Sequence, residues 1–239
     1  AVASDGLALQ HASAELAQDR DVVEAAVGQN GRALQFAGEA LRGDRRICLK
    51  AASRCGLALR YTAEHIRRDS EIVLKAVQEN NAAIQFADRC VAVQLIRRTG
   101  ALLRYAPETL QSDPEAILAA VRQSHTSLQY AAPGIRASKP VMLAVMRQNG
   151  RALKYVAESL QADRDVILAA VAQDVRAAAY IPVALRSDPA MAVDVVEANP
   201  RAMQYHAVAP THSREFILAS VRRRGQALRW VPPAFRADH

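Results

Sequence analysis

Apolar and polar residues recur along the chain with a period of about 25 residues. Each repeat opens with glycine or a substitute, continues with aliphatic residues and an aromatic, and closes with a second apolar group. The repeats begin at Gly6, Gly31, Gly56, Asn81, Gly100, His125, Gly150, Val175, Pro200 and Gly225. The spacing is 25 throughout, except that it falls to 19 between Asn81 and Gly100. Self-similarity at a short fixed period is the signature of a repeat architecture.

The first half of each repeat predicts a helix. Repeat positions 3, 4, 7 and 11 are apolar, as in Ala33, Leu34, Ala37 and Leu41, and this spacing places them in one stripe of an α-helix. Position 6, beside the stripe, is aromatic in every repeat but the first, where it is His11: Phe36, Tyr61, Phe86, Tyr105, Tyr130, Tyr155, Tyr180, Tyr205 and Trp230. We interpret these rings as packing between repeats, although such rings can also stack on nucleic-acid bases.

The second half predicts another helix, capped at repeat position 14. Aspartate usually stands there, and its side chain can accept the free amides of a helix start. The capping residues are Asp19, Asp44, Asp69, Asp113, Asp163 and Asp188, with Ser138 and Ser213 as substitutes. We expect the next repeat's glycine to end this helix in a left-handed conformation. Asn81 can do the same, but Val175 and Pro200 cannot do so comfortably, so those two junctions should be built differently.

Helices of about ten residues are unstable alone in water, so each repeat must bury its apolar stripes against its neighbours. The sequence therefore predicts an all-α fold, an α-solenoid in which short two-helix repeats form a superhelical stack. We expect one domain over residues 1–239, with about nine and a half repeats of 25 residues and a shortened repeat at 81–99.

In the shortened repeat, Asp88 falls on the capping position, so the six lost residues are repeat positions 8 to 13. This deletion predicts a local change of superhelix curvature near Phe86 to Arg89. A hinge, a binding cleft and a tolerated deletion are the alternatives.

The recurring string resembles a known repeat family. Gly31-Arg-Ala-Leu-Gln-Phe-Ala and Asp163-Arg-Asp-Val-Ile-Leu-Ala-Ala-Val carry the resemblance to the domain of unknown function 4116, whose unit is similar to two of these repeats. It covers essentially the whole chain. The shortened repeat and the segment Val208-Ala-Pro-Thr211 depart from the pattern. The resemblance implies the fold, and it brings no assigned activity or site.

Composition limits the partners and the compartment. A net charge of +7 and an isoelectric point of about 9.7 are compatible with nucleic acid or an acidic protein surface. Cys48, Cys55 and Cys90 form no CxxC pair, which indicates reduced thiols in the cytoplasm or another reducing compartment. No apolar run approaches the roughly 20 residues of a membrane span. The chain starts without methionine and stops partway through a repeat, as expected of a piece of a longer array.

Repeat position 5 is the most regular polar position, and we take it as the candidate partner-binding face. On a continuous helix it lies opposite the apolar stripe, where repetition would place equivalent donors in a row. Glu64, Glu108 and Glu158 follow four residues after its cations, so i,i+4 ion pairs on a solvated face are the plainer interpretation. The candidate face comprises Gln35, Arg60, Gln85, Arg104, Gln129, Lys154, Gln204 and Arg229, with Gln10 at the first repeat and Ala179 as the exception.

Nothing in the sequence indicates catalysis, a cofactor or a metal site. Glycine-rich phosphate loops and nucleophile signatures are absent, and the polar residues mostly repeat their counterparts. The nearest histidine pair, His206 and His212, straddles a proline-containing linker.

The sequence therefore predicts a non-catalytic protein–protein interaction scaffold that presents an extended curved polar face. A nucleic-acid-binding helical array is the second hypothesis, although glutamates interleaved with the cations argue against it. A targeting or regulatory module of a larger enzyme is the third.

Overall fold

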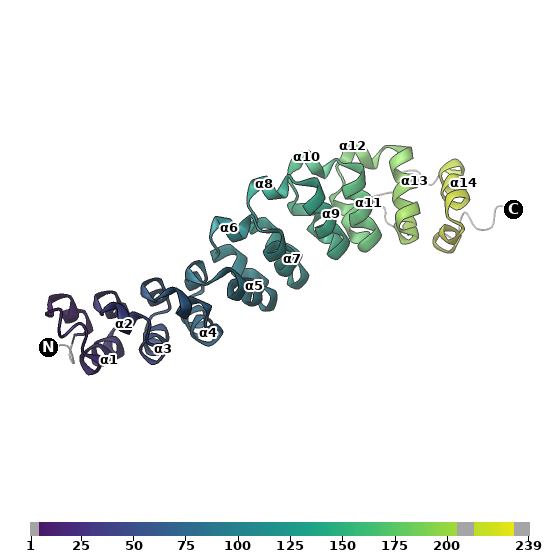
Figure 1. Cartoon of the computed structure of the whole chain (residues 1–239). Coiled ribbons are helices and arrows are strands. Elements are labelled where there is room, and N and C mark those ends of the chain that lie inside the picture. Colours follow the sequence, from purple (N-terminus) through teal and green to yellow (C-terminus); the bar gives the residue numbers. More distant parts are fainter. Residues whose placement is uncertain (1–4, 205–212, 232–239) are drawn as a thin grey trace. The chain divides into compact units, whose positions relative to one another are not determined.

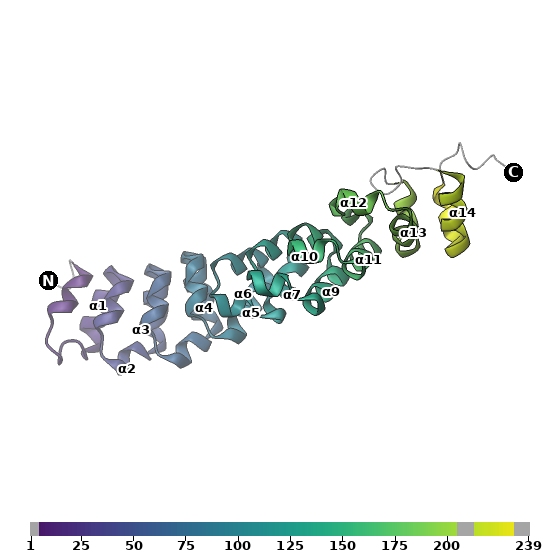
Figure 2. The same cartoon turned by 90° about the horizontal axis from the view of Figure 1, so that it is seen from above.

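The computed structural model describes residues 5–204 and 213–231, and every regular element in these ranges is an α-helix or a 3-10 helix. The chain divides into two compact units, Ala1–Gln111 and Ser112–His239. Within each unit the repeats stack in sequence order. In the first, for example, helix α3 (Arg45–Arg54) packs between α1 (Arg20–Gln29) and α4 (Ser70–Glu79) (Figures 1 and 2). The predicted all-α repeat solenoid is confirmed.

Six of the described repeats contain three elements, where the sequence predicted two. The repeat opens with a 3-10 helix: η1 (Gly6–His11), η2 (Gly31–Phe36), η3 (Gly56–Tyr61), η5 (Asn81–Phe86), η6 (Gly100–Tyr105), η7 (His125–Tyr130), η8 (Gly150–Tyr155), η9 (Val175–Tyr180), η10 (Pro200–Gln204) and η11 (Gly225–Trp230). A short helix follows: α2 (Glu39–Arg42), η4 (Glu64–Arg68), α6 (Glu108–Gln111), α8 (Pro133–Arg136), α10 (Glu158–Gln161) and α12 (Val183–Arg186). A ten-residue α-helix closes the repeat: α1, α3 and α4 as above, then α5 (Arg89–Arg98), α7 (Pro114–Gln123), α9 (Lys139–Gln148), α11 (Arg164–Gln173), α13 (Pro189–Ala198) and α14 (Arg214–Arg223).

Two extended residues at repeat positions 7 and 8 break the predicted first helix. In the second repeat, Ala37 has φ −71° and ψ 152°, and Gly38 has φ −59° and ψ 154°. Carbonyl groups at the break lack helical partners, and the long side chain at position 12 reaches back to that of position 7. Gln161 Nε2 donates to the carbonyl of Val156 at 3.0 Å, and Arg186 Nε donates to that of Ile181 at 2.8 Å. The prediction of one continuous helix was wrong because it missed this side-chain support.

The burial pattern and the second helix follow the prediction. Positions 3 and 4 are buried, as in Ala58 and Leu59, and the second-helix positions Ile72 and Val73 are fully buried. The Asp69 carboxylate accepts a hydrogen bond from the amide of Glu71 at 2.9 Å and so caps α4. Of the two serine substitutes, Ser213 caps α14 through Phe216 N at 3.2 Å, whereas Ser138 makes no side-chain cap.

The predicted left-handed glycine cap is wrong, because no described residue has a positive φ. The residue before the glycine is extended instead, as Asn30 is with φ −141° and ψ 112°, and its side chain accepts from Arg32 N at 3.0 Å. Glycine is needed for a different reason. A Cβ on Gly31 would collide with the carbonyl oxygen of Ala51, which lies in the α-helix of the same repeat. The glycine thus lets η2 pack directly on α3.

The junctions at Val175 and Pro200 are built like the others, contrary to the prediction. Asp174 is extended before η9, with φ −141° and ψ 117°, and its carboxylate accepts from Arg176 N at 2.9 Å. No left-handed residue is required, so valine and proline fit. Their effect is on packing. Helices η1, η2, η3 and η8, which begin with glycine, pack closely on the α-helix of their own repeat, and comparable packing is not found among the described residues between η9 and α13 or between η10 and α14.

In the shortened repeat the short helix is absent, and α5 follows η5 directly. In the second and third repeats, the amide at position 8 donates to a carbonyl of the preceding repeat, as Ala63 N does to Arg42 O at 2.9 Å. Asp88 makes the equivalent bond to Arg67 O at 3.0 Å and also caps α5 through Cys90 N at 2.9 Å. One residue therefore performs the functions of positions 8 and 14. The close packing of α3 on α4 is not kept between α4 and α5. A hinge here stays a prediction.

Candidate functional site

The cations of the array fall into two sets, and the first set holds the repeats together. At position 15, a basic residue bridges to the capping aspartate of the next repeat. Arg20 Nη1 lies 2.9 Å from Asp44 Oδ2, and Arg45 Nε lies 2.8 Å from Asp69 Oδ2. In the second unit, Lys139 Nζ lies 2.8 Å from an Asp163 oxygen. We call these bridges the Asp–Arg ladder. The sequence signal is a basic residue directly after the capping Asp or Ser, and its role in bridging repeats was not predicted.

The ladder perturbs the pKa values of its members. Hydrogen bonds from the Ile47 amide and from Arg20 hold the pKa of Asp44 below its usual value. The hydrogen bond from Lys139 lowers the pKa of Asp163, and the same contact raises that of Lys139. Burial raises the pKa of Asp69, but bonds from Arg45 and two backbone amides outweigh this effect, so its pKa is also lowered. The aspartates are therefore ionised structural groups.

Among the described residues of the second unit, one carboxylate is buried. Asp194, which is 6% exposed, pairs with Arg164 of the preceding repeat and with Arg223 of the following repeat, whose Nη1 lies 2.7 Å away. Both arginines reach solvent, so the charge is shared across three repeats. The buried Asp194 carboxylate is thus explained by its role in linking neighbouring repeats.

The predicted face lies on the 3-10 helices. Arg60, Gln85, Arg104, Gln129, Lys154 and Arg229 are exposed, Gln35 is half-buried, and Gln204 belongs to η10. Consecutive 3-10 helices pack side by side within each unit, from η1 to η6 in the first and from η7 to η11 in the second. Equivalent side chains at positions 2, 5 and 6 are thus brought together. We call the set of side chains at these positions the 3-10 row. Each unit has its own row.

The cations at position 5 lie over aromatic rings and do not form the predicted i,i+4 pairs. The Cζ of Arg60 lies 5.3 Å from the ring centre of Tyr61 and 5.8 Å from that of Phe86 in the next repeat. Glu64 pairs instead with Arg68 at 2.6 Å. Lys154 Nζ lies 5.7 Å from the ring centre of Tyr155. The pairs fail because the extended residues separate position 5 from position 9.

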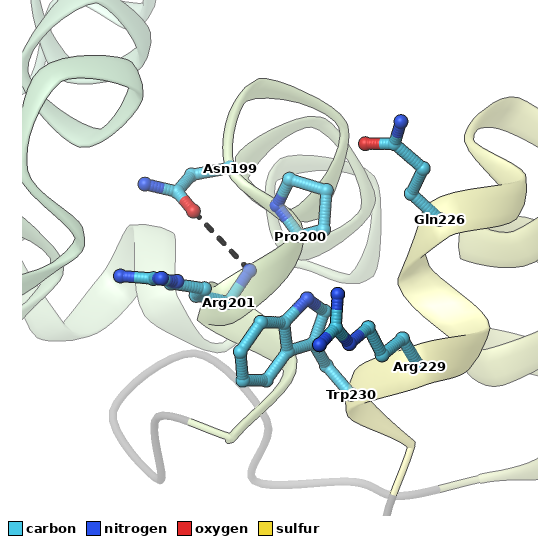
Figure 3. Close-up of a pocket in the computed structure, with 6 residues that line it drawn as sticks. All are labelled: Asn199, Pro200, Arg201, Gln226, Arg229 and Trp230. Carbon is cyan, nitrogen blue, oxygen red and sulfur yellow. Dashed lines mark hydrogen bonds between the residues drawn. The ribbon is translucent and has the colours of Figure 1, made fainter.

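Grooves lie between neighbouring 3-10 helices. One of about 270 Å³ is lined by Arg32, Gln35, Leu57, Arg60 and Tyr61. In the second unit, a groove of about 480 Å³ runs from η9 to η10, and one of about 410 Å³ runs from η10 to η11. The last is lined by Asn199, Pro200, Arg201, Gln226, Arg229 and Trp230 (Figure 3).

The row carries positive charge that the described part of the chain does not balance. No aspartate or glutamate stands at position 2, 5 or 6 of any repeat. Five row cations have no carboxylate of the described residues within ion-pair distance, namely Arg32, Arg60, Arg151, Lys154 and Arg201. Burial lowers the pKa of the nearby His125, and the charges of Arg151 and Lys154 lower it further. Ladder cations are paired internally and these row cations are not.

Other chemistry is sparse in the parts of the chain that the structure describes. They hold no group of three or more His, Cys, Asp or Glu side chains placed to bind a metal, and no helix long and apolar enough to cross a membrane. Cys48 is buried, which raises its thiol pKa to about 12, while Cys90 is exposed. His206, His212, Tyr205 and the segment 208–211 lie outside the described residues.

The tandem organisation agrees with a known family. The family model of the domain of unknown function DUF4116 matches residues 1–42, 44–90, 88–136 and 139–186. The chain belongs to the DUF4116 family. Each DUF4116 match spans about two repeats, and the second and third matches meet at 88–90, where the short helix is missing. No curated protein and no solved structure matches the chain.

Proposed function

We propose that this DUF4116 array is a non-catalytic scaffold that binds a protein partner along the 3-10 row, within a reducing compartment. The difference between the two sets of cations carries the proposal. The ladder cations form ion pairs with capping aspartates. In contrast, Arg32, Arg60 and Arg201 face solvent with no carboxylate partner among the described residues. A charged group left without an internal partner contributes little to folding and is suited to an external one.

The row also has the composition of a binding surface. Half-buried aromatic rings fixed against the stack supply rigid contact area at low conformational cost, and arginine adds directional donors. Gln85 is exposed in the row of the first unit and Gln129 in the row of the second, and each can hydrogen-bond a partner's backbone. Because the pattern recurs in each repeat, several modest contacts can sum along the stack.

Nucleic acid is the second candidate, and the absence of acidic residues from the row favours it. The glutamates at position 9 lie on the short helices, so they interrupt the row less than the sequence suggested. Base stacking, however, needs an open ring face. The rings of Tyr61, Tyr155 and Trp230 each have a cation within 6 Å of the ring centre. We therefore favour protein.

Site-specific photo-crosslinking in living cells tests the proposal. A photoreactive residue replaces Gln85 in the row and, as the matched control, Lys75 on the exposed side of α4. Adducts to peptide at position 85 and not at position 75 are expected, and mass spectrometry identifies the attached material. Nucleotide adducts at position 85, or equal peptide adducts at both positions, would reject the assignment.

A further inference from the structure

We propose that the row of the second unit, from η8 to η11, binds an extended acidic segment of the partner that carries a carboxylate at about every third residue. This inference rests on the proposed function and adds the partner's chemistry.

The row is most strongly cationic in this unit. Each of its four 3-10 helices contributes at least one cation: Arg151 and Lys154 from η8, Arg176 from η9, Arg201 from η10 and Arg229 from η11. Arg176 pairs at 3.3 Å with Asp174, the last residue of the preceding repeat, and that carboxylate also caps η9. The Nε of Arg151 is buried and has no hydrogen-bond partner in the described structure. Cationic donors therefore recur in consecutive repeats, and Arg151, Lys154 and Arg201 have no described carboxylate within ion-pair distance.

Trp230 forms an anchor at one end of this row. The Cζ atoms of Arg201 and Arg229 lie 5.3 Å and 5.8 Å from its ring centre, and both side chains border the groove between η10 and η11 (Figure 3). Asn199 holds the base of η10 through its bond to Arg201 N at 3.2 Å. A guanidinium group stacked on a ring keeps its in-plane N–H donors directed outward, where they match the two oxygens of a carboxylate.

The repeat spacing selects the form of the segment. Packed helices lie about 8–10 Å apart, so cations in neighbouring repeats should recur at about that interval. A polyproline II chain advances about 3.1 Å per residue and has three residues per turn, which places every third side chain on one side at about 9 Å. One carboxylate per turn can thus meet one cation per repeat. Carboxylates on adjacent residues cannot match this spacing of the cations.

The covered rings favour a carboxylate-bearing peptide over single-stranded nucleic acid. Both ligands offer anions, but sequence-tolerant binding of single strands depends on bases stacking on aromatic faces. In this row the Trp230 ring has two guanidinium groups against it, and the Tyr155 ring has Lys154. RNA is retained as an outcome of the experiment.

Binding to synthetic peptides tests the inference on the full chain. The probe is a fluorescein-labelled peptide of four Glu-Pro-Pro units, compared with the Gln-Pro-Pro analogue, with an isomer that has its four glutamates adjacent, and with a labelled oligouridine. Anisotropy gives the dissociation constants, and Trp230, the single tryptophan of the chain, reports groove occupancy by fluorescence. Arg201→Gln and Lys154→Gln remove row cations. Arg147→Gln is the control, since it removes an exposed charge from α9 outside the row.

The spaced peptide should bind more tightly than both peptide controls and should change Trp230 emission. Because a charge-assisted hydrogen bond is lost, Arg201→Gln should weaken binding about tenfold, and Lys154→Gln should weaken it measurably. Arg147→Gln should change it less than about twofold. Equal binding of the spaced and clustered peptides, equal effects of the three substitutions, or tighter binding of oligouridine would each overturn the inference. If no acidic peptide binds but peptide adducts still form at position 85, the inference fails and the scaffold proposal stands.

Discussion

Replacing Gly56 with alanine should destabilise the first unit through one methyl group. A Cβ at this position would overlap the carbonyl oxygen of Ala76, and it would lie 3.0 Å from Asn80 N and 3.1 Å from the Ala76 carbonyl carbon. All three contacts are with the backbone of α4 or its cap, so no side-chain rotation relieves them.

The magnitude follows from two opposing effects. Overpacking of a closed contact costs about 1–3 kcal/mol. Alanine also lowers the entropy of the unfolded chain relative to glycine, and this effect stabilises the folded state by about 0.4–1 kcal/mol. We therefore expect a net loss of about 1–2 kcal/mol, equivalent to roughly 2–8 °C in the unfolding midpoint for a chain of this size. The strain should move η3 off α4, as η9 is less closely packed on α13 where Val175 replaces the glycine.

Urea unfolding followed by circular dichroism measures the loss, and hydrogen exchange over residues 56–79 localises it. Gly134→Ala is the matched control, because a Cβ there meets no atom within 4 Å and the residue lies inside α8. The control should be neutral or slightly stabilising. If Gly56→Ala is as stable as Gly134→Ala and exchange near η3 is unchanged, close backbone packing is not the reason for the glycine.

Three further outcomes follow from the structure. Asp69→Ala removes the cap of α4 and a ladder bridge, so it should lower the free energy of unfolding by about 1 kcal/mol. Urea titration measures this loss, and an unchanged unfolding midpoint would argue against the cap. The folded-state pKa values of Asp44, Asp69 and Asp163 lie below 3.8, so their contribution to stability is complete above about pH 4 and is lost as pH falls through the folded values. Thermal unfolding between pH 2 and pH 6 should show that decline, and a flat profile would contradict it. Iodoacetamide should label the exposed Cys90 in the folded chain and label the buried Cys48 only after unfolding, and equal rates followed by mass spectrometry would refute the burial.

The repeat pattern was sufficient to predict the fold because the same apolar positions recur many times over. The stripe at Ala58 and Leu59 and the cap at Asp69 were correct, since burial and capping depend on local residue type. The helix break was not predictable from periodicity, because the extended residues leave the apolar spacing intact. Its support, the fold-back of Gln161 and Arg186 onto carbonyl groups, is a tertiary feature.

The candidate surface was predicted only in part. Position 5 was chosen from the sequence and its cations are exposed, but their ring partners depend on which repeats lie side by side. Arg60 reaches Phe86 only because η3 packs on η5. The contribution of position 2, seen in Arg32 and Arg201, was missed because these residues vary between repeats. The glycine was recognised as special for the wrong reason, since a left-handed cap and a close backbone approach select the same residue.

Charge reversal most directly tests the distinction between the ladder cations, which hold repeats together, and the row cations, which do not. Arg45→Glu would place a third carboxylate beside Asp69 and Glu71, whereas Arg60→Glu would place one on a row where the described structure offers no acidic neighbour within ion-pair distance. Thermal unfolding at low salt should show a clear loss of stability for Arg45→Glu and little change for Arg60→Glu, and 1 M salt should narrow the difference. Equal destabilisation by the two substitutions would mean that the row cations hold the fold together, and the account of a surface kept for a partner would be wrong.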